Sequence, residues 1–319
     1  MRKNYLPLDF AKIKTYPLSE RKNRVKIKDF AKPLEKEGKA TELLNSFPHI
    51  LMGESFREVV KAIACAYHED KMVISAMGAH VIKCGLSPII IDLMERGIIK
   101  AVALNGAGAI HDFEIALIGE TSEDVAEGLQ KGMFGMVEET GRLMNEAING
   151  NSNKDMGMGY VLGEKLIKLN APYNKYSVLA TGVQLGIPLT VHVAIGTDII
   201  HMHPTANGAA MGEKSFIDFR LLSSIVADLN DGGVFLNIGS AVILPEVFLK
   251  ALTLARNLKY KVENFTTVNL DMYQHYRPTQ NVVRRPTAKS GKGYTLLGPH
   301  EILIPLLALA VIEIIEEKE

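Results

Sequence analysis

The sequence predicts a doubly wound α/β fold, with a mainly parallel sheet and helices on both faces. Five short segments are nearly all apolar rather than alternating, as expected for parallel strands buried on both faces. Several of them lead directly into glycine or asparagine, and longer stretches with helix signals separate them. A strand–turn–helix order that repeats in this way is typical of the fold. The expected strands are residues 72–75, 101–104, 189–195, 234–238 and 265–270.

The first 50 residues are expected to form an arm, with helices, that packs on the core or on a neighbouring subunit. This region is polar and contains the basic run RKNRVKIK, which starts at Arg21. The run is short and has few aromatic neighbours, which favours a packing role over nucleic-acid binding. Residues 51–319 are then expected to form a single α/β domain.

Helix signals lie between the expected strands. Pro88 fits the first turn of a helix that Gly97 ends, because proline lacks the N–H that would be unpaired there and glycine tolerates a left-handed conformation. Thr121 and Asp124 resemble a capping pair for a helix that runs to about residue 148.

Two further helices are expected in the second half of the chain. One begins at Leu244-Pro245 and runs to about Asn257. The other contains the apolar run 302–312 with Pro305, which is too short to span a bilayer and is interpreted as a buried helix.

The composition excludes several classes of protein. The chain has 319 residues, with 36 basic and 36 acidic side chains, so its formal net charge is zero. A protein that grips nucleic-acid phosphates would show a basic excess. With only Cys65 and Cys84, a disulfide framework is excluded. Free thiols, and an N-terminus without the apolar core of a signal peptide, predict a cytoplasmic protein. Neither a membrane nor a nucleic-acid partner is expected.

Ligands of doubly wound sheets bind beyond the carboxyl ends of the strands, so the residues that follow the expected strands are candidates. The sharpest feature is ALNGAGAIHDFEIAL, which starts at Ala103. Gly106 and Gly108 match the first two glycines of a dinucleotide fingerprint, but His111 stands at the third position. A tight β–α turn explains the same pattern equally well.

His111 and Asp112 follow this turn and are candidate acid–base groups. Adjacent residues on a helix point in different directions, so they are not expected to form a dyad. The alternative is that Asp112 caps a helix while His111 lines a pocket.

A second cluster contains Asp198, His201 and His203. In an extended segment the two histidines would point to the same side, and with the carboxylate they could bind a divalent metal. There is no HExxH motif, so a polar substrate pocket without metal is the preferred interpretation.

A third cluster is the basic segment from Tyr273 to Tyr294, which contains Lys292. A lysine with a lowered pKa can act as a nucleophile, and a loop over an active site has this composition. A solvated basic loop has it too.

Four segments resemble, in the same order, parts of deoxyhypusine synthase-like proteins. The first, which starts at Ser75, is SAMGAHVIKCGLSPIIIDLMERGIIKAVALNGAGAIHDFEIAL. The others are SVLATGVQLGIPLTVHVAIGTDIIHMH, GGVFLNIGSAVILPEVFLKA and EILIPLLALAVIE. The resemblance extends from about Gly53 to the C-terminus.

The resemblance implies a Rossmann-like fold that binds NAD, and a homo-oligomer (dimer or tetramer) with active sites at dimer interfaces. It also implies a transferase whose reaction begins with dehydrogenation by NAD and passes through an imine with an enzyme lysine. Together with Gly108 of the glycine-rich turn, the implied cofactor-binding residues are Gly78, His80, Gly85, Asn105, Gly106, Gly239 and Ser240.

The segment that matches the family's catalytic loop differs from it. It reads RPTQNVVRRPTAKSGKGY, without tryptophan and without paired acids. A polyamine cation needs carboxylates around it, whereas histidine and arginine gather here, which favours an anionic or neutral ligand. We therefore expect a related NAD-binding enzyme that acts on a small amine or amino-acid-like substrate, rather than deoxyhypusine synthesis.

The expected catalytic residues are His111, Asp112, His201, His203 and Lys292, with no metal. Two alternatives stay open. One is a metal-assisted hydrolase or lyase that uses Asp198, His201 and His203. The other is a non-catalytic nucleotide-binding protein.

Overall fold

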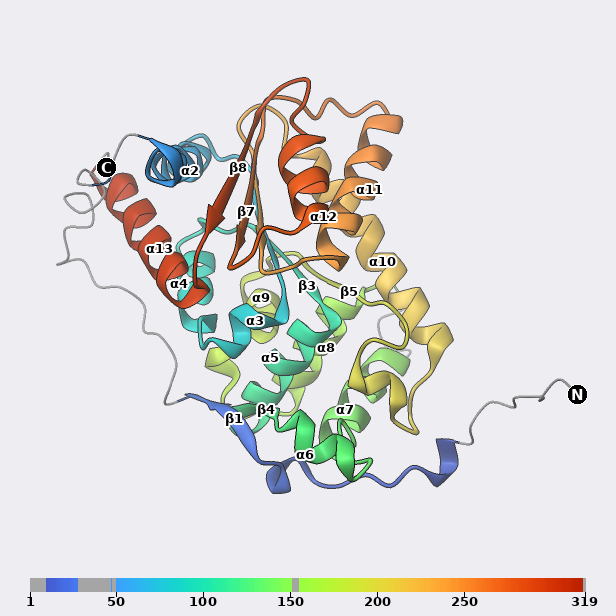
Figure 1. Ribbon diagram of the computed structural model, residues 1–319. Coiled ribbons are helices and arrows are strands. Elements are labelled where there is room, and N and C mark those ends of the chain that lie inside the picture. The colour runs from blue at the N-terminus through green and yellow to red at the C-terminus, as the bar shows by residue number, and fades with distance from the viewer. Residues whose placement is uncertain (1–9, 28–46, 48–49, 151–154, 318–319) are drawn as a thin grey trace, which may run out of the picture.

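The computed structural model describes residues 10–27, 47, 50–150 and 155–317. At its centre is a six-stranded sheet in the order β5-β3-β2-β6-β7-β8, in which every neighbouring pair is parallel (Figure 1). The strands are β2 (Val73–Met77), β3 (Ala101–Asn105), β5 (Leu189–His192), β6 (Val234–Ile238), β7 (Thr266–Asp271) and β8 (Lys292–Leu297). The predicted fold class is confirmed.

The chain builds the sheet outward from its centre. It runs from β2 to β3 and β5, crosses back to β6 on the other side of β2, and continues outward to β7 and β8. The strand order therefore reverses between β2 and β6. In a sheet of this kind the reversal leaves a crevice beyond the carboxyl ends of the two central strands.

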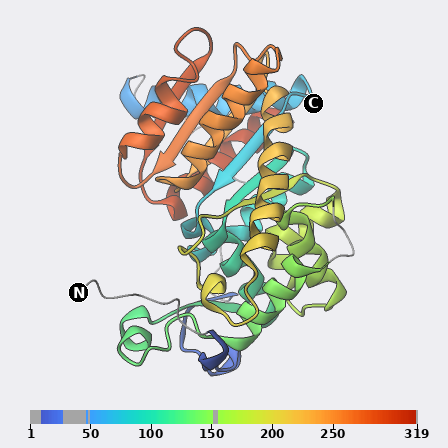
Figure 2. The same cartoon turned by 90° about the vertical axis from the view of Figure 1, so that its right-hand side faces the viewer.

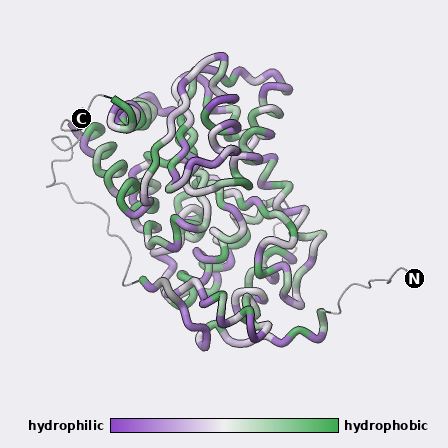
Figure 3. The backbone as a smooth tube through the Cα atoms, viewed as in Figure 1, coloured by the Kyte–Doolittle hydropathy of each residue, from purple (hydrophilic) through white to green (hydrophobic). Residues whose placement is uncertain are grey.

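Helices cover both faces of the sheet (Figures 1 and 2). One face packs against α2 (Leu51–His68), α4 (Ser87–Glu95) and α13 (His300–Glu316), and the other against α10 (Gly208–Ala227) and α11 (Ile243–Asn257). Central strands serve both layers: Val73 and Met77 belong to the first core, and Ile74 and Ala76 to the second. This double burial explains why their sequences are apolar throughout. Figure 3 shows the same hydrophobic character along α13.

The remaining elements lie mostly around the carboxyl edge and the lower half of the molecule in Figure 1. The helices are α3 (Ala79–Lys83), α5 (Gly106–Ile118), α6 (Val125–Gln130), α7 (Glu138–Asn149), α8 (Met158–Lys168), α9 (Val178–Leu185) and α12 (Tyr276–Pro278). A π-helical turn spans Thr279–Arg284, and 3-10 turns span Phe10–Lys12, Leu18–Glu20, Asn174–Tyr176 and Ile199–Met202. The strands β1 (Asn23–Lys26) and β4 (Glu120–Glu123) form a small antiparallel pair.

Two predictions about secondary structure are wrong. The single helix expected from Thr121 to about residue 148 is divided into β4, α6 and α7. Thr121 lies in β4, and its hydroxyl donates to Glu114, while Asp124 alone caps α6 by accepting from the amides of Ala126 and Glu127.

The second error concerns the segment 273–294, which was expected to be a basic loop. Its last residues belong to the edge strand β8, which pairs along its length with β7. Most residues of β8 are partly exposed, so the strand lacks the all-apolar pattern of its neighbours.

The described part of the N-terminal arm packs beside α5 and α7. Arg21 donates two hydrogen bonds to Glu114 of α5, with N–O distances of 2.7 and 2.6 Å. Both side chains are almost completely buried, at 3% and 0% exposure. Thr140 of α7 donates to the same carboxylate at 3.0 Å. Among the described residues, no helix is long and apolar enough to cross a membrane.

Replacing Arg21 with alanine is expected to destabilise the protein by about 3–5 kcal/mol, because Glu114 would be left buried without its cation. Lys131→Ala is the matched control, since Lys131 forms an exposed pair with Glu127 and its loss should change stability little. Chemical denaturation at neutral pH measures both. If both variants lose the same free energy of unfolding, the buried ion pair is not a major source of stability.

Candidate functional site

The reversal of strand order brings two glycine turns into contact. Gly78 follows β2 and Gly239 follows β6, and a Cβ atom on Gly78 would lie only 2.2 Å from the carbonyl oxygen of Gly239. Gly239 also has a φ of +64°, which favours glycine. The strand order β5-β3-β2-β6-β7-β8 corresponds to the 3-2-1-4-5-6 order of dinucleotide-binding sheets, with β2 as the first strand.

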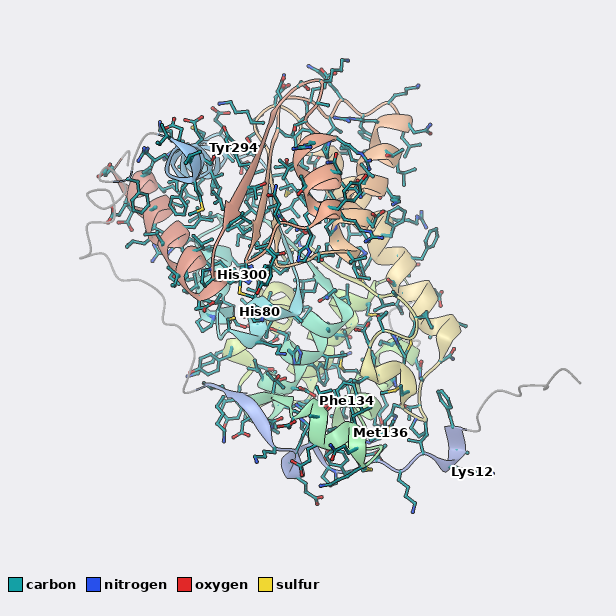
Figure 4. The ribbon with its side chains drawn as sticks, viewed as in Figure 1. Lys12, His80, Phe134, Met136, Tyr294 and His300 are labelled. Carbon is teal, nitrogen blue, oxygen red and sulfur yellow. The ribbon has the colours of Figure 1, made fainter. Side chains whose placement is uncertain are left out.

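Two histidines meet beside these turns. His80 lies in α3, which follows β2, and His300 begins α13, which follows β8. Their ring centroids are 5.6 Å apart (Figure 4). The Nε2 atom of His300 lies 3.3 Å from the carbonyl oxygen of Leu270, at the end of β7. The carboxyl ends of β2, β6, β7 and β8 thus lie around the histidine pair.

The surroundings of His80 favour a neutral imidazole. Burial, together with the nearby His300 and Lys83, lowers the pKa of His80, although Glu301 and Asp271 oppose the shift. His300 is 1% exposed, and its Nδ1 atom has no hydrogen-bond partner among the described residues. A buried nitrogen without a partner is costly and marks a position where a ligand or water can bind.

The turn after β3, by contrast, is already filled by side chains of the protein. The Asn105 side chain caps α5 by accepting from the amide of Gly108 at 2.9 Å. Asp198 accepts from the amide of Ala107, and a Cβ atom on Gly106 would lie 2.1 Å from its Oδ2 atom. The amides that we expected to bind a phosphate at this turn therefore serve Asn105 and Asp198 instead.

Asp198 is nevertheless unusual as a helix cap. It is 9% exposed, and burial raises its pKa to about 6, with hydrogen bonds from Thr197 and Ala107 acting in the opposite direction. Its carboxyl group borders a cavity of about 220 Å³.

This cavity lies beyond the carboxyl edge of the sheet, between α3, α5, β4 and the loop after β5. It combines charged groups with an apolar wall. Its lining includes Lys83, His111, Glu123, Asp198, Val125 and Phe134. Larger hollows lie elsewhere: one of about 740 Å³ between α10 and α11, one of about 450 Å³ between α2 and β8, and one of about 350 Å³ between the N-terminal arm and α6. The first two are away from the carboxyl edge, and the third is lined by residues of the arm and of β4 to α6. We therefore place the candidate site at the smaller cavity, which contains His111 and Asp198.

The two expected acid–base residues of α5 point to different sides of the helix, as expected for adjacent positions. His111 lines the cavity, and its Nδ1 atom lies 2.7 Å from the hydroxyl of Thr121. Asp112 is fully buried on another side and accepts from Ser177 and from the amides of Val178 and Leu179. These hydrogen bonds are with the start of α9, and Asp112 does not line the cavity, so its role is to stabilise a helix.

His201 and His203 do not converge. The Nδ1 atom of His201 accepts from the amides of Gly196 and Asp198, and the ring stays close to the cavity loop. His203 points to α7, where its Nε2 atom lies 3.5 Å from Glu138. Their segment is a short 3-10 turn rather than a strand, so residues two apart diverge. Within the described ranges, no three His, Cys, Asp or Glu side chains lie close enough together to bind a metal ion.

Lys292 lies at the wrong edge of the sheet for the expected role. It begins β8 and is level with Thr266, the first residue of β7, so it stands at the amino edge. Its side chain is 66% exposed, and its ammonium group pairs with Glu58 of α2 at 3.0 Å. Tyr294, further along β8, lies far from the two histidines in Figure 4.

Three of the residues implied for the cofactor have local structural roles. Gly85 has a φ of +74° in the turn between α3 and α4. The hydroxyl of Ser240 accepts from the amide of Leu244, 3.2 Å away, at the start of α11. The amide of Gly78 donates to Ile238 at 2.8 Å. Of the implied set, His80 thus offers the side chain best placed for a ligand.

The sequence patterns did not identify His300, Lys83 or the Arg21–Glu114 pair. His300 stands in the run GPHEIL, and only the presence of β8 before it shows that it follows a strand end. Lys83 is one helical turn after His80, which is a signal visible in the sequence once α3 is known.

No family model and no curated protein matches this sequence. Solved structures do match. A ternary complex of AgrE with ornithine and NAD+ superposes with a TM-score of 0.55 and 13% identity, covering 89% of this chain and 34% of AgrE. A protein from Entamoeba histolytica assigned as a deoxyhypusine synthase has a TM-score of 0.50 and 11% identity, covering 89% and 97% of the two chains.

This chain therefore spans about a third of the AgrE chain. At such low identities the likeness concerns the fold. The sheet and its helices form a Rossmann-like α/β fold, shared with AgrE and with the Entamoeba protein.

Substitution of Asp198 by asparagine should alter how stability depends on pH. The folded protein holds a proton on Asp198 up to about pH 6, whereas the unfolded chain releases it near 3.8. As pH rises from 4 to 6, the free energy of unfolding of the wild type should fall relative to that of Asp198→Asn.

Denaturant titrations at several pH values measure this difference. Asp70→Asn is the control, because the exposed Asp70 has a pKa lowered by its hydrogen bond to Lys100. The free energy of unfolding of the wild type relative to that of Asp70→Asn should therefore not fall between pH 4 and pH 6. If the free energy of unfolding of the wild type relative to that of Asp198→Asn stays constant or rises over this pH range, a raised pKa of Asp198 is contradicted.

Proposed function

We propose that the protein is an enzyme that binds NAD at the carboxyl edge of the sheet and acts on a small amine or amino-acid-like substrate in the adjacent cavity. The observation that carries the proposal is the reversal of strand order at β2 and β6, with His80 and His300 beside it. Dinucleotides bind such sheets at this reversal. The AgrE structure of the same fold contains NAD+, which supports the choice of cofactor.

The proposed pyrophosphate position is the start of α3 rather than the start of α5. The first amides of a helix have no partner within it, and in α3 no side chain caps them. Phosphate groups favour such positions, because the unpaired amides can donate to them. At α5 the same groups are occupied by Asn105 and Asp198.

The cavity offers matching partners for a zwitterion. Lys83 can pair with a carboxylate, while Asp198 and Glu123 can accept from an ammonium group. Burial raises the pKa of both carboxyl groups, so a bound cation would relieve the cost of their ionisation. Val125 and Phe134 provide an apolar wall for a short carbon chain.

NAD would supply hydride acceptance, and the chain itself would handle protons and orientation. A neutral His80 can accept a proton at near-neutral pH, and His300 packs against it and restricts its position. The proposal contains no imine with Lys292, because that lysine lies at the opposite edge of the sheet.

Calorimetric titration of the purified protein with NAD+ should give a dissociation constant in about the micromolar range. His80→Ala should weaken NAD+ binding by about tenfold or more, and Lys83→Met should weaken binding of L-ornithine, used as the zwitterionic probe, in the presence of NAD+. Lys292→Ala is the matched control and should bind both ligands as the wild type does.

Absence of any heat with NAD+ would overturn the cofactor proposal. Binding of NAD+ that is lost equally in Lys292→Ala and His80→Ala would overturn the placement of the site.

A further inference from the structure

A second surface, on the face of the sheet covered by α10 and α11, has features that the proposed enzyme site does not use. The two helices border an open hollow of about 740 Å³. Large apolar side chains around it are exposed to solvent, including Phe216 (61%), Leu258 (60%) and Tyr260 (58%). Figure 2 shows α10 along its whole length on the side that faces the viewer. Clustered exposure of this kind indicates an interaction surface.

Two charged side chains lie on this surface. Glu213 and Arg220 of α10 are exposed and flank Phe216 along the helix. In the part of the chain that the structure describes, neither side chain has an ion-pair or hydrogen-bond partner. Elsewhere on the surface, charged helix residues commonly pair with a neighbour one turn away, as Lys131 does with Glu127.

The spacing of these residues makes the surface complementary to itself. Glu213 and Arg220 are seven residues apart, which places them on one face and roughly 10.5 Å apart along the axis. The midpoint between them is at Phe216 and Ile217. If a second α10 packs antiparallel about that midpoint, the acid of each copy faces the base of the other. A twofold axis then passes beside Phe216.

We propose that this face of α10 and α11 is the contact between two copies of the chain, related by a twofold axis near Phe216. In this arrangement Phe216 packs against its counterpart, and two Glu213–Arg220 ion pairs close the contact on either side. A twofold contact requires one surface to be self-complementary, and the antiparallel charge pattern on α10 meets that requirement. Central aromatic and arginine side chains with charged groups at the rim are typical of protein interfaces.

Charge reversal tests the pairing directly. The variant Glu213→Arg carries two positive charges on this face of α10, and Arg220→Glu carries two negative charges there. Each variant alone repels its own copy, so the dimer dissociation constant should rise by about tenfold or more. When the two variants are mixed, every charge faces an opposite one, and a one-to-one heterodimer should form. The double variant Glu213→Arg/Arg220→Glu should dimerise again.

Analytical ultracentrifugation of the full chain, with circular dichroism to verify folding, provides the readout. Lys168→Glu is the matched control, because it reverses an exposed helix charge away from this surface and should leave dimerisation unchanged. Phe216→Ser should also weaken the dimer.

A wild-type protein that is monomeric at every concentration tested would overturn the proposal. So would a dimer that persists in both single reversals, or single reversals whose mixture stays monomeric.

Discussion

The amides at a buried helix start must find an acceptor, and in this chain aspartates from distant segments provide it. Asp112 accepts from the first amides of α9, Asp218 from an amide of α8 and one of β5, and Asp198 from an amide of α5. Each contact joins segments that are far apart in sequence. Burial raises the pKa of all three carboxyl groups, to about 6 for Asp112 and Asp198 and about 7 for Asp218.

The same requirement distinguishes two helix starts at the carboxyl edge of the sheet. Of the helices that begin after the first two strands of the sheet, α5 starts with its amides in use, whereas α3 starts without a side-chain cap. The glycine-rich sequence of the Asn105 turn therefore does not by itself predict a phosphate site. Its glycines are needed because Asp198 and Asn105 approach closely. The less conspicuous turn at Gly78–His80 has no side-chain cap.

Sequence patterns predicted the central sheet because burial on both faces makes a strand uniformly apolar, which is a local signal. They did not predict β8, whose side chains are partly exposed at the edge of the sheet. That single omission affected the site twice. Without β8, Lys292 was expected in an active-site loop, whereas it is the first residue of that strand. His300 was not recognised as a residue that follows a strand end. Likewise, β4 forms by pairing with β1, about a hundred residues earlier, and no local pattern at Thr121 can reveal such a partner.

The ion pair between Arg21 and Glu114 has a thermodynamic consequence, because both residues also border the cavity beside Asp198. The arm is thus part of the cavity wall, and detaching it would open the wall and expose a buried charge. A ligand that fills the cavity and contacts this wall would bind the form in which the arm is attached. By mass action it shifts the equilibrium toward an attached arm, and an attached arm in turn raises the affinity for the ligand. Attachment of the arm and binding of a ligand in the cavity would therefore be thermodynamically linked.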